Sequence, residues 1–260
     1  MENFGHYLAH DLARAVAFPH GLFSPTASRD PAQIARVIKD QLDIGGAARV
    51  IIEKRIERHC SMIKDLGGDC RKFGSTDWMA IGLGIPTLLE NGIQLDWSSG
   101  WPIVPGPSLK GAVRAWVEYA ASEGRLSELG VCSIEDFVDI YFLVFGCGPD
   151  EDDHGSVGTV RFFDSWFHTD DQTRIGFDVM TPHYGDYQRN GASPSDWLNP
   201  NPVPFLAVEP GATLVVGLAP RGAGDQDLIS IAWKWVEPTL AENGLGAKIA
   251  EGMGRFTPKS

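Results

Sequence analysis

Apolar residues recur at helical spacing in the first part of the chain. Asp30, Pro31 and Gln33 form a capping-box start with proline at the first helical position. Two apolar stripes with three- and four-residue spacing follow, separated by two glycines. The stripes consist of Ile34, Val37, Ile38 and Leu42, then Ile52, Ile56, Ile63 and Leu66. This pattern predicts an N-terminal helical region over residues 1–75, packed on the rest of the chain or inserted before it.

From residue 76 to residue 260 the pattern changes to short strands with glycine and proline turns. A helix is predicted to follow an N-cap at Ser108, with an apolar stripe from Leu109 to Ala120, and another one over residues 229–240, kinked at Pro238. Residues 137–145 suit either a helix or a buried strand, and residues 181–210 form a long loop. Strands are predicted at residues 79–85, 88–97, 157–163, 213–218 and 254–257. The resulting order of strand, helix, strands, helix and strand predicts an α+β fold of ferredoxin-like type.

Charge and cysteine content narrow the class of protein. The formal net charge of −12 argues against a free-standing, sequence-independent nucleic-acid binder, but it leaves room for a local basic face. The four cysteines lack the spacing of a zinc knuckle, and no secretory apolar segment starts the chain. These features predict a reduced cytoplasmic protein without a membrane span, a metal or a cofactor.

A first candidate site lies where the predicted helix begins, at residues 105–114. Lys110 falls in the first turn, where the helix dipole favours anions, and Gly111 is a poor helix former. Lys110 and Arg114 are four residues apart, so two cations share one face. Backbone N–H groups at a helix start with two cations suit a phosphate. The alternative is an ordinary turn into a helix with solvated cations.

A second candidate site is the glycine-rich segment at residues 244–256, which contains Lys248 and Arg255. It lacks the ending of a Walker loop, and Ile249 stands where a dinucleotide fingerprint needs its third glycine. Such a segment can pass close to a polyanion. The alternative is a helix C-cap followed by a tight turn into a strand.

Together the two segments resemble the RAMP superfamily of CRISPR proteins. The motifs are Pro-Gly-x-Ser-Leu-Lys-Gly-x-x-Arg at residues 105–114 and Gly-Leu-Gly-Ala-Lys…Gly-x-Gly-Arg-Phe at residues 244–256. Residues 178–187 and 199–206 narrow the resemblance to the terminal RAMP subunit of type III-B, or Cmr, effector complexes. The resemblance covers about residues 78–257 and leaves the N-terminal third unassigned.

The resemblance implies a ferredoxin-like RNA-recognition fold with insertions and a non-catalytic subunit in antiviral defence. It would grip guide RNA toward the 3′ end and join the backbone of the ribonucleoprotein to its head. Its partners would be the guide RNA, neighbouring RAMP subunits, the small helical subunit as a further candidate, and target RNA through the guide. The residues implied in the grip are Ser108, Lys110, Gly111, Arg114, Gly246, Lys248, Gly252, Gly254 and Arg255.

Three aromatic residues extend the expected RNA site. His183, Tyr184 and Tyr187 lie in a segment of the long loop that narrows the resemblance. Their rings are expected to stack on splayed bases, as is usual for single-stranded RNA. The alternative is a loop packed by its own aromatic side chains.

The alternative function is a RAMP endoribonuclease that processes guide RNA or cuts target RNA. Relatives that cut RNA use an aspartate in the loop before the first helix, where this chain has Asp96 at a strand end. His183 is a lone histidine, which is weak evidence for catalysis. The segment from Asp150 to His154 could bind a divalent ion, but a solvated acidic loop is the favoured interpretation. Binding without catalysis is therefore favoured. A third candidate is an assembly protein whose RNA contacts are incidental.

Overall fold

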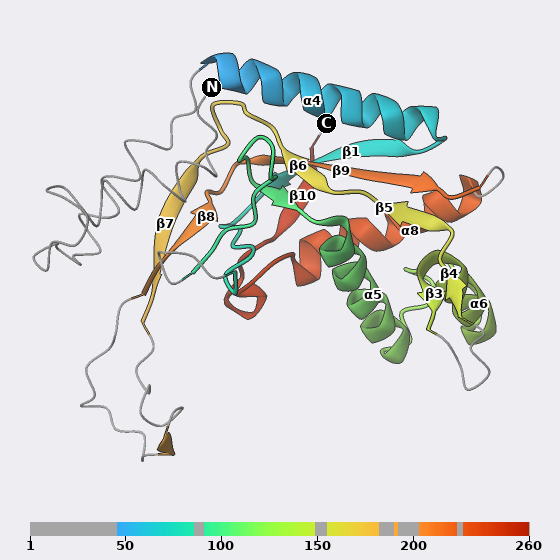
Figure 1. Ribbon diagram of the computed structural model, residues 1–260. Helices are drawn as coiled ribbons and strands as arrows, with labels where there is room; N and C mark the ends of the chain where they lie inside the picture. Colours follow the sequence, from blue (N-terminus) through green and yellow to red (C-terminus); the bar gives the residue numbers. More distant parts are fainter. Residues whose placement is uncertain are drawn as a thin grey trace, which may run out of the picture.

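The computed structural model describes residues 46–85, 91–148, 155–181, 190–191, 203–222 and 226–259. Its centre is a six-stranded sheet in the order β10-β1-β9-β6-β2, with β5 also paired to β9 (Figure 1). All of these pairings are antiparallel. The strands are β1 Asp69–Ser75, β2 Ile103–Val104, β5 Val160–Phe162, β6 Ser165–Phe167, β9 Thr213–Pro220 and β10 Phe256–Lys259.

Helices cover both faces of this sheet (Figure 1). Helix α4 (Gly46–Asp65) lies on one face, and α5 (Gly106–Ser122) and α8 (Gln226–Pro238) lie on the other. A side chain at Gly217 of β9 would come within 2.3 Å of Ile63, so the absence of one lets α4 approach the sheet. On the opposite face the ring of Phe73 stacks on Trp233 of α8, with 6.3 Å between centroids.

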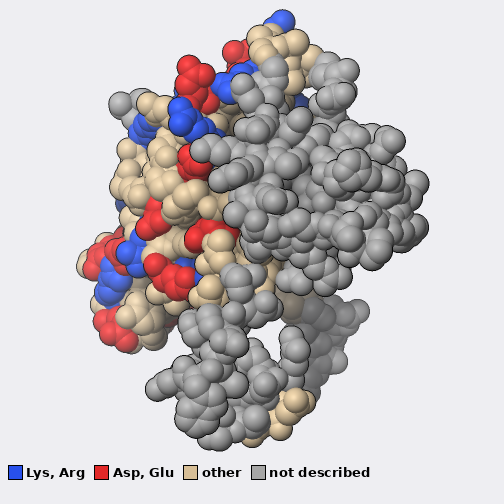
Figure 2. Space-filling view, turned by 90° about the vertical axis from the view of Figure 1, so that its left-hand side faces the viewer, with Lys and Arg blue, Asp and Glu red and all other residues tan. Residues whose placement is uncertain are grey.

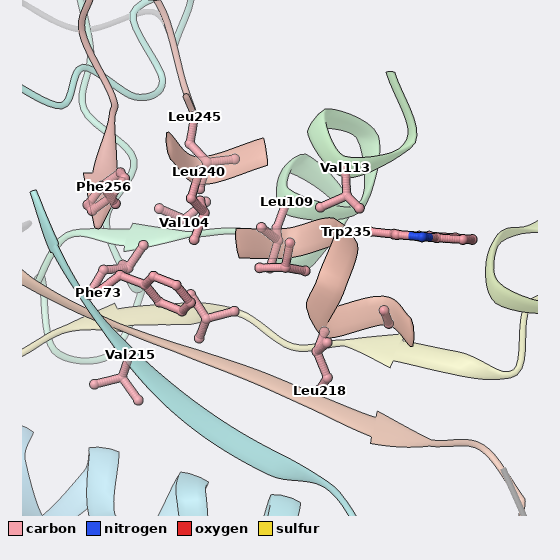
Figure 3. Packing of buried hydrophobic residues seen from close by; sticks show 14 of the residues in the cluster. Phe73, Val104, Leu109, Val113, Val215, Leu218, Trp235, Leu240, Leu245 and Phe256 are labelled. Atoms are coloured by element: carbon pink, nitrogen blue, oxygen red, sulfur yellow. The ribbon is translucent and has the colours of Figure 1, made fainter. Parts of the chain in front are cut away.

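The core lies between the sheet and the α5–α8 layer. Figure 3 shows Leu109 of α5 close to Val104 of β2, and Leu240 close to Leu245. All four residues are buried, as is Trp235, whose indole N–H donates to the Leu129 carbonyl at 2.9 Å. After α8 the chain continues as a π-helical turn, η2 (Thr239–Asn243), which also packs on α5. The start of α5 and the entry to the C-terminal glycine-rich segment are therefore anchored in one core.

Smaller units lie at the ends of this core (Figure 1). At one end, α6 (Ile134–Phe145) is capped by the Ser133 side chain and followed by the pair β3 (Gly146–Cys147) and β4 (Ser156–Val157). At the other end, β7 (Ile175–Met180) and β8 (Val203–Val208) form a two-stranded sheet. A short 3₁₀ turn, η3 (Ile249–Glu251), precedes β10. No helix among the described residues is long and apolar enough to span a membrane.

The α+β class is confirmed, with antiparallel sheets and helices in one core, and the ferredoxin-like arrangement stays a prediction. One part of the predicted helical region is wrong, because residues 69–75 form β1 in the interior of the sheet. The periodicity was too short there to separate strand from helix. The first predicted helix, at residues 30–45, lies outside the described residues, and the division of the chain at residue 75 stays a prediction.

Other local predictions need correction. Residues 79–85 form no strand, since Met79 and Ala80 make only isolated bridges to Val208 and Ala247. Residues 91–97 also form no strand. The described part of the predicted long loop includes β8, which pairs with β7. Residues 137–145 are helical, and Pro238 ends α8 where the π-helical turn begins.

Candidate nucleic-acid interface

The start of α5 does not offer free N–H groups to a phosphate. Its N-cap is Pro105, with no side-chain cap, so the predicted cap at Ser108 is wrong. The Gly106 N–H donates to the Asp164 carboxylate at 2.7 Å. The N–H groups of Ser108 and Leu109 donate to the Pro105 carbonyl, at 2.9 and 3.1 Å, and Pro107 has no N–H. The anion preference of this helix start is thus satisfied within the protein.

Lys110 instead belongs to a group of cations that meet beside the start of α5. Its ammonium donates to the Phe145 carbonyl at the end of α6, at 2.8 Å. Burial lowers the pKa of Lys110, and the nearby charges of Arg221 and Arg114 lower it further. The guanidinium of Arg161 in β5 donates to the Arg221 main-chain carbonyl at 3.4 Å, but Arg161 is not among the charges that act on Lys110. We call Lys110, Arg114 and Arg221 the α5–β9 basic cluster.

Among the described residues, Arg114 is the member of the cluster that has an acidic partner. Its guanidinium donates to Glu118 at 3.0 Å and to the Tyr141 hydroxyl at 2.6 Å. The hydrogen bond to Glu118, and then that to Tyr141, raise the pKa of Arg114. The Tyr141 hydroxyl in turn donates to Glu118. Arg114 is therefore partly neutralised and links α5 to α6, and its guanidinium is less available to RNA than that of Arg221.

Arg221 is the residue that completes the cluster. It follows β9 directly, is exposed, and its Nε donates to the Gly158 carbonyl at 3.1 Å. The sequence prediction named neither Arg221 nor Arg161. The alternation of residues 157–163 placed Arg161 on a strand, but only the register of β5 against β9, with Arg161 opposite Ala219, brings it toward Arg221.

Ser108 and Gly111 lie on the open surface of α5 next to the cluster, and both are exposed. A side chain built at Gly111 would have no heavy atom within 4 Å. The fold itself therefore does not require glycine at this position. This leaves the close approach of another molecule as the predicted reason for it.

The glycine-rich segment serves the fold in a way that the sequence did not reveal. Gly246 and Gly254 have φ values of 90° and 75°. Side chains there would come within 2.2 Å of the Ala80 carbonyl oxygen and 1.9 Å of the Leu245 carbonyl oxygen. The Gly254 and Ala247 N–H groups donate to the Trp78 and Ala80 carbonyls, both at 2.7 Å. These glycines let the segment dock on residues 78–80.

The cations of the glycine-rich segment differ in their surroundings. The Lys248 ammonium donates to both Glu251 oxygens, at 2.7 and 2.6 Å, and lies 5.7 Å from the Phe205 ring centroid. Its side chain is 17% exposed, so its charge is largely neutralised within the chain. Gly252 ends η3 at a φ of 98°. Arg255 is exposed, and its carbonyl accepts from the Thr76 N–H at 2.9 Å.

The two predicted segments share a core but present their charges to different places. Leu109 and Leu245 are both buried in it (Figure 3). The Lys110 ammonium contacts the end of α6, whereas the Lys248 ammonium contacts η3 and β8. Lys110 and Lys248 therefore do not form one combined cation site, as the motifs had suggested. The α5–β9 basic cluster is the more compact candidate for RNA binding.

The predicted stacking residues His183, Tyr184 and Tyr187 lie outside the described residues. The same holds for residues 150–154 of the acidic loop. Within the described part of the chain, no group of three or more histidine, cysteine, aspartate or glutamate residues has the geometry of a metal site.

Asp96, the acid of the alternative function, organises its own loop. Its carboxylate accepts from the Ser98 and Ser99 N–H groups, at 3.1 and 2.7 Å, and from both of their hydroxyls. Arg55 of α4 forms an ion pair with it at 3.3 Å. Although burial raises the pKa of Asp96, the hydrogen bonds from Ser98 and Ser99 and the charge of Arg55 bring it below its ordinary value. These contacts give Asp96 a structural role in holding its loop against α4.

The cations of α4 are also tied to acids of the same chain. Arg49 pairs with Asp171 at 3.0 Å, as Arg55 does with Asp96. On the face drawn in Figure 2, acidic and basic side chains of the described residues lie interspersed. This favours a solvated or internally paired face over RNA contact.

Comparison with known proteins shows which family the chain resembles. The family model of the RAMP superfamily matches residues 70–257. The CRISPR system Cmr subunit Cmr6 of Pyrococcus furiosus is 25% identical over 268 residues, covering 84% of this chain and 76% of that protein.

A solved structure has the same fold. A chain in the cryo-EM structure of the type III-B Cmr-beta bound to cognate target RNA is similar, with a TM-score of 0.65 and 19% identity. The match covers 88% of this chain and 71% of that one. The crystal structure of Cmr6 from Pyrococcus furiosus matches with a TM-score of 0.49 and 24% identity, over 74% of this chain and 98% of that one.

Proposed function

The chain belongs to the RAMP superfamily, and we propose on this premise that it is a non-catalytic RNA-binding subunit of a type III-B CRISPR effector complex. In this role it grips guide RNA toward the 3′ end and joins the backbone of the complex to its head in antiviral defence. Two comparisons support the proposal. The Pyrococcus furiosus relative is by name a Cmr subunit, and the structure of similar fold is a Cmr complex with target RNA.

The observation that carries the RNA-binding part is the α5–β9 basic cluster. Like charges at close range are unfavourable, and Lys110 has a lowered pKa partly because of Arg221 and Arg114. A phosphate placed among these cations removes the repulsion and gains charge-assisted hydrogen bonds. Lys110 lies on α5 and Arg221 follows β9, so a ligand that touches both must span two elements, as a backbone segment of RNA can.

The net charge of −12 fits the proposal when the rest of the surface is considered. A local basic face would hold RNA, while acidic surfaces would meet basic neighbouring subunits. The proposed partners are guide RNA, neighbouring RAMP subunits, the small helical subunit, and target RNA paired with the guide.

The first test measures binding of a fluorescent guide RNA to the purified chain at several salt concentrations. Lys110→Met and Arg221→Met remove a charge with little change in side-chain length. Each is expected to weaken binding by about 1 kcal/mol and to reduce the slope of log affinity against log salt by about 0.7, the value for one single-strand phosphate contact. Arg114→Met is expected to have a smaller effect, because Glu118 already neutralises Arg114.

The matched control is Lys64→Met, at an exposed cation in the last turn of α4 and away from the cluster. It should leave both affinity and salt slope unchanged. Equal losses in Lys64→Met and Arg221→Met would mean that binding depends on overall charge alone, and would remove the cluster from the proposal.

The non-catalytic part needs its own assay. The purified chain is incubated with guide precursor and with target RNA, with and without divalent metal. The proposal expects intact RNA in all samples. Cleavage that is lost in Asp96→Asn or His183→Ala would instead establish the endoribonuclease alternative.

A further inference from the structure

Helix α6 is apolar on two sides. Its inner side packs into the core, where the rings of Phe137 and Phe145 lie 6.3 and 5.7 Å from that of Trp235. Its outer side is also apolar, although it faces away from the core: Ile134, Val138, Phe142 and Leu143 are 49, 41, 45 and 48% exposed. An apolar side of a helix is normally covered by another element or another molecule.

The exposed residues have a regular arrangement. Ile134, Val138 and Phe142 follow one another at intervals of four residues and form a stripe along the helix. Glu135 and Asp139 lie next to this stripe and are exposed, and Leu143 lies beyond them. Helix α6 contains three acidic residues and neither lysine nor arginine. We call this surface the outer face of α6.

The outer face of α6 continues onto the neighbouring strand pair. Thr159 donates to the Leu143 carbonyl with its N–H at 2.7 Å and with its hydroxyl at 2.8 Å. This brings the chain that follows β4 against the end of α6, and Val157 of β4 is 70% exposed. Figure 1 shows α6, β3 and β4 together at one end of the molecule, where a neighbouring protein can reach them. Several large apolar side chains on one exposed surface mark an interaction site.

We propose that the outer face of α6 docks a helix of a neighbouring protein subunit whose apolar side is flanked by lysine or arginine. The inference rests on the proposed function, because it supplies a surface for one of the protein contacts of that complex. Stripes at four-residue spacing are how one helix packs against another. The carboxylates beside the stripe select a basic partner by charge complementarity.

RNA is a poor occupant of this surface. Its phosphates would face Glu135, Asp136 and Asp139, and three of the four exposed apolar side chains of α6 are aliphatic and give no stacking platform. The cations that suit RNA lie at the end of the helix instead, where the Lys110 ammonium contacts the Phe145 carbonyl. Helix α6 would thus stand between an RNA contact at its C-terminal end and a protein contact along its side.

The first experiment compares assembly of the complex with wild-type chain and with Val138→Ala/Phe142→Ala. Sedimentation of the reconstituted complex is expected to show at least about tenfold weaker incorporation of the variant, the size of a typical hot-spot loss. Glu135→Lys/Asp139→Lys should weaken incorporation as well, by repelling the basic partner. The control is Ile51→Ala/Met62→Ala, at apolar positions of α4 that are 41 and 43% exposed, which should assemble like wild type.

Two further measurements separate the possible failures. Circular dichroism of each isolated variant should match that of the wild-type chain, and so should the guide-RNA affinity of Val138→Ala/Phe142→Ala and of Ile51→Ala/Met62→Ala, which change neither the charge nor the basic cluster. Failure of the wild-type chain to bind guide RNA would overturn the proposed function. The assembly experiment would still decide the docking proposal. Full incorporation of Val138→Ala/Phe142→Ala would overturn the docking proposal alone.

A photo-crosslink identifies the occupant directly. Phe142 is replaced by p-benzoylphenylalanine, the complex is assembled and irradiated, and the attached peptide is sequenced. The expected product is a helical segment of another protein subunit with lysine or arginine beside its apolar residues. Attachment to RNA, to a second copy of this chain, to its own residues 1–45, or to nothing in an assembled complex would each overturn the proposal.

Discussion

Two glycines of the RAMP motifs have opposite surroundings, which separates fold from binding at the scale of single residues. Gly254→Ala is expected to lower the free energy of unfolding by about 2 kcal/mol or more, because its φ is 75° and a side chain would meet the Leu245 carbonyl oxygen at 1.9 Å. Gly111→Ala is expected to raise it by about 1 kcal/mol, since alanine is the better helix former in an open position. Urea unfolding of both variants measures these changes.

The same Gly111→Ala variant tests the predicted approach of RNA. If guide-RNA backbone lies against α5 at Gly111, affinity should fall by several-fold even though the protein is more stable. A gain in stability with unchanged affinity would leave Gly111 without a role in binding. Destabilisation by Gly111→Ala would contradict the open surroundings themselves.

The sequence predicted which residues belong to the candidate site better than it predicted their contacts. The motifs led to Lys110, whose ammonium is part of a cation cluster. They could not show that the Lys248 charge is neutralised by Glu251, or that the Gly106 N–H is bound to Asp164. They also missed Arg221, because its place beside Lys110 depends on packing between elements that are far apart in sequence.

Between elements, the Glu53 carboxylate is one of the groups that link α4 to the residues after β6. Glu53 accepts from the Thr169 hydroxyl and from His168 Nδ1, both at 2.8 Å. Burial raises the pKa of Glu53, but the hydrogen bonds from Thr169 and His168 outweigh it, and the pKa is lowered. The stabilisation is therefore present above the unfolded-state pKa, near 4.3, and is lost as the pH falls through the folded-state pKa.

Glu53→Gln should accordingly be less stable than wild type at pH 7, by about 1 kcal/mol after allowance for the partial exposure of this side chain. The difference should be smaller at pH 3 than at pH 7, because the Glu53 carboxylate takes up a proton as the pH falls through its lowered pKa. Urea unfolding of both proteins at the two pH values measures it. A difference that persists unchanged at pH 3 would show that the carboxylate charge has no part in the link.

Helices were easier to predict than strands because their apolar stripes are long. The sequence predicted helices in the regions of α4, α5 and α8, and the structure has helices there. The interior strand β1 was missed because its sequence, Asp-Cys-Arg-Lys-Phe-Gly-Ser, has one large buried apolar side chain, Phe73. A strand of this kind is recognisable only from its partners, which lie at the other end of the chain.

For the molecule as a whole, Phe256 fastens the edge strand β10 to the sheet. It is fully buried and lies opposite Ser75 of β1, and its ring lies 6.4 Å from that of Phe167. Phe256→Ala is expected to lower the free energy of unfolding by about 3–5 kcal/mol, because a large cavity is left in the core. Thr257→Ala, at the exposed neighbouring position, should change it little. Thermal unfolding of the two variants gives the comparison.

The position of β1 has a consequence for how the protein is made. Its two neighbours in the sheet, β9 and β10, both come from the last part of the sequence. While a ribosome is still producing the middle of the chain, β1 therefore has two open edges and no partner strand. Pairings between such distant segments also close slowly. The newly made protein should depend on chaperones or on its neighbouring subunits during this interval more than its finished stability would suggest.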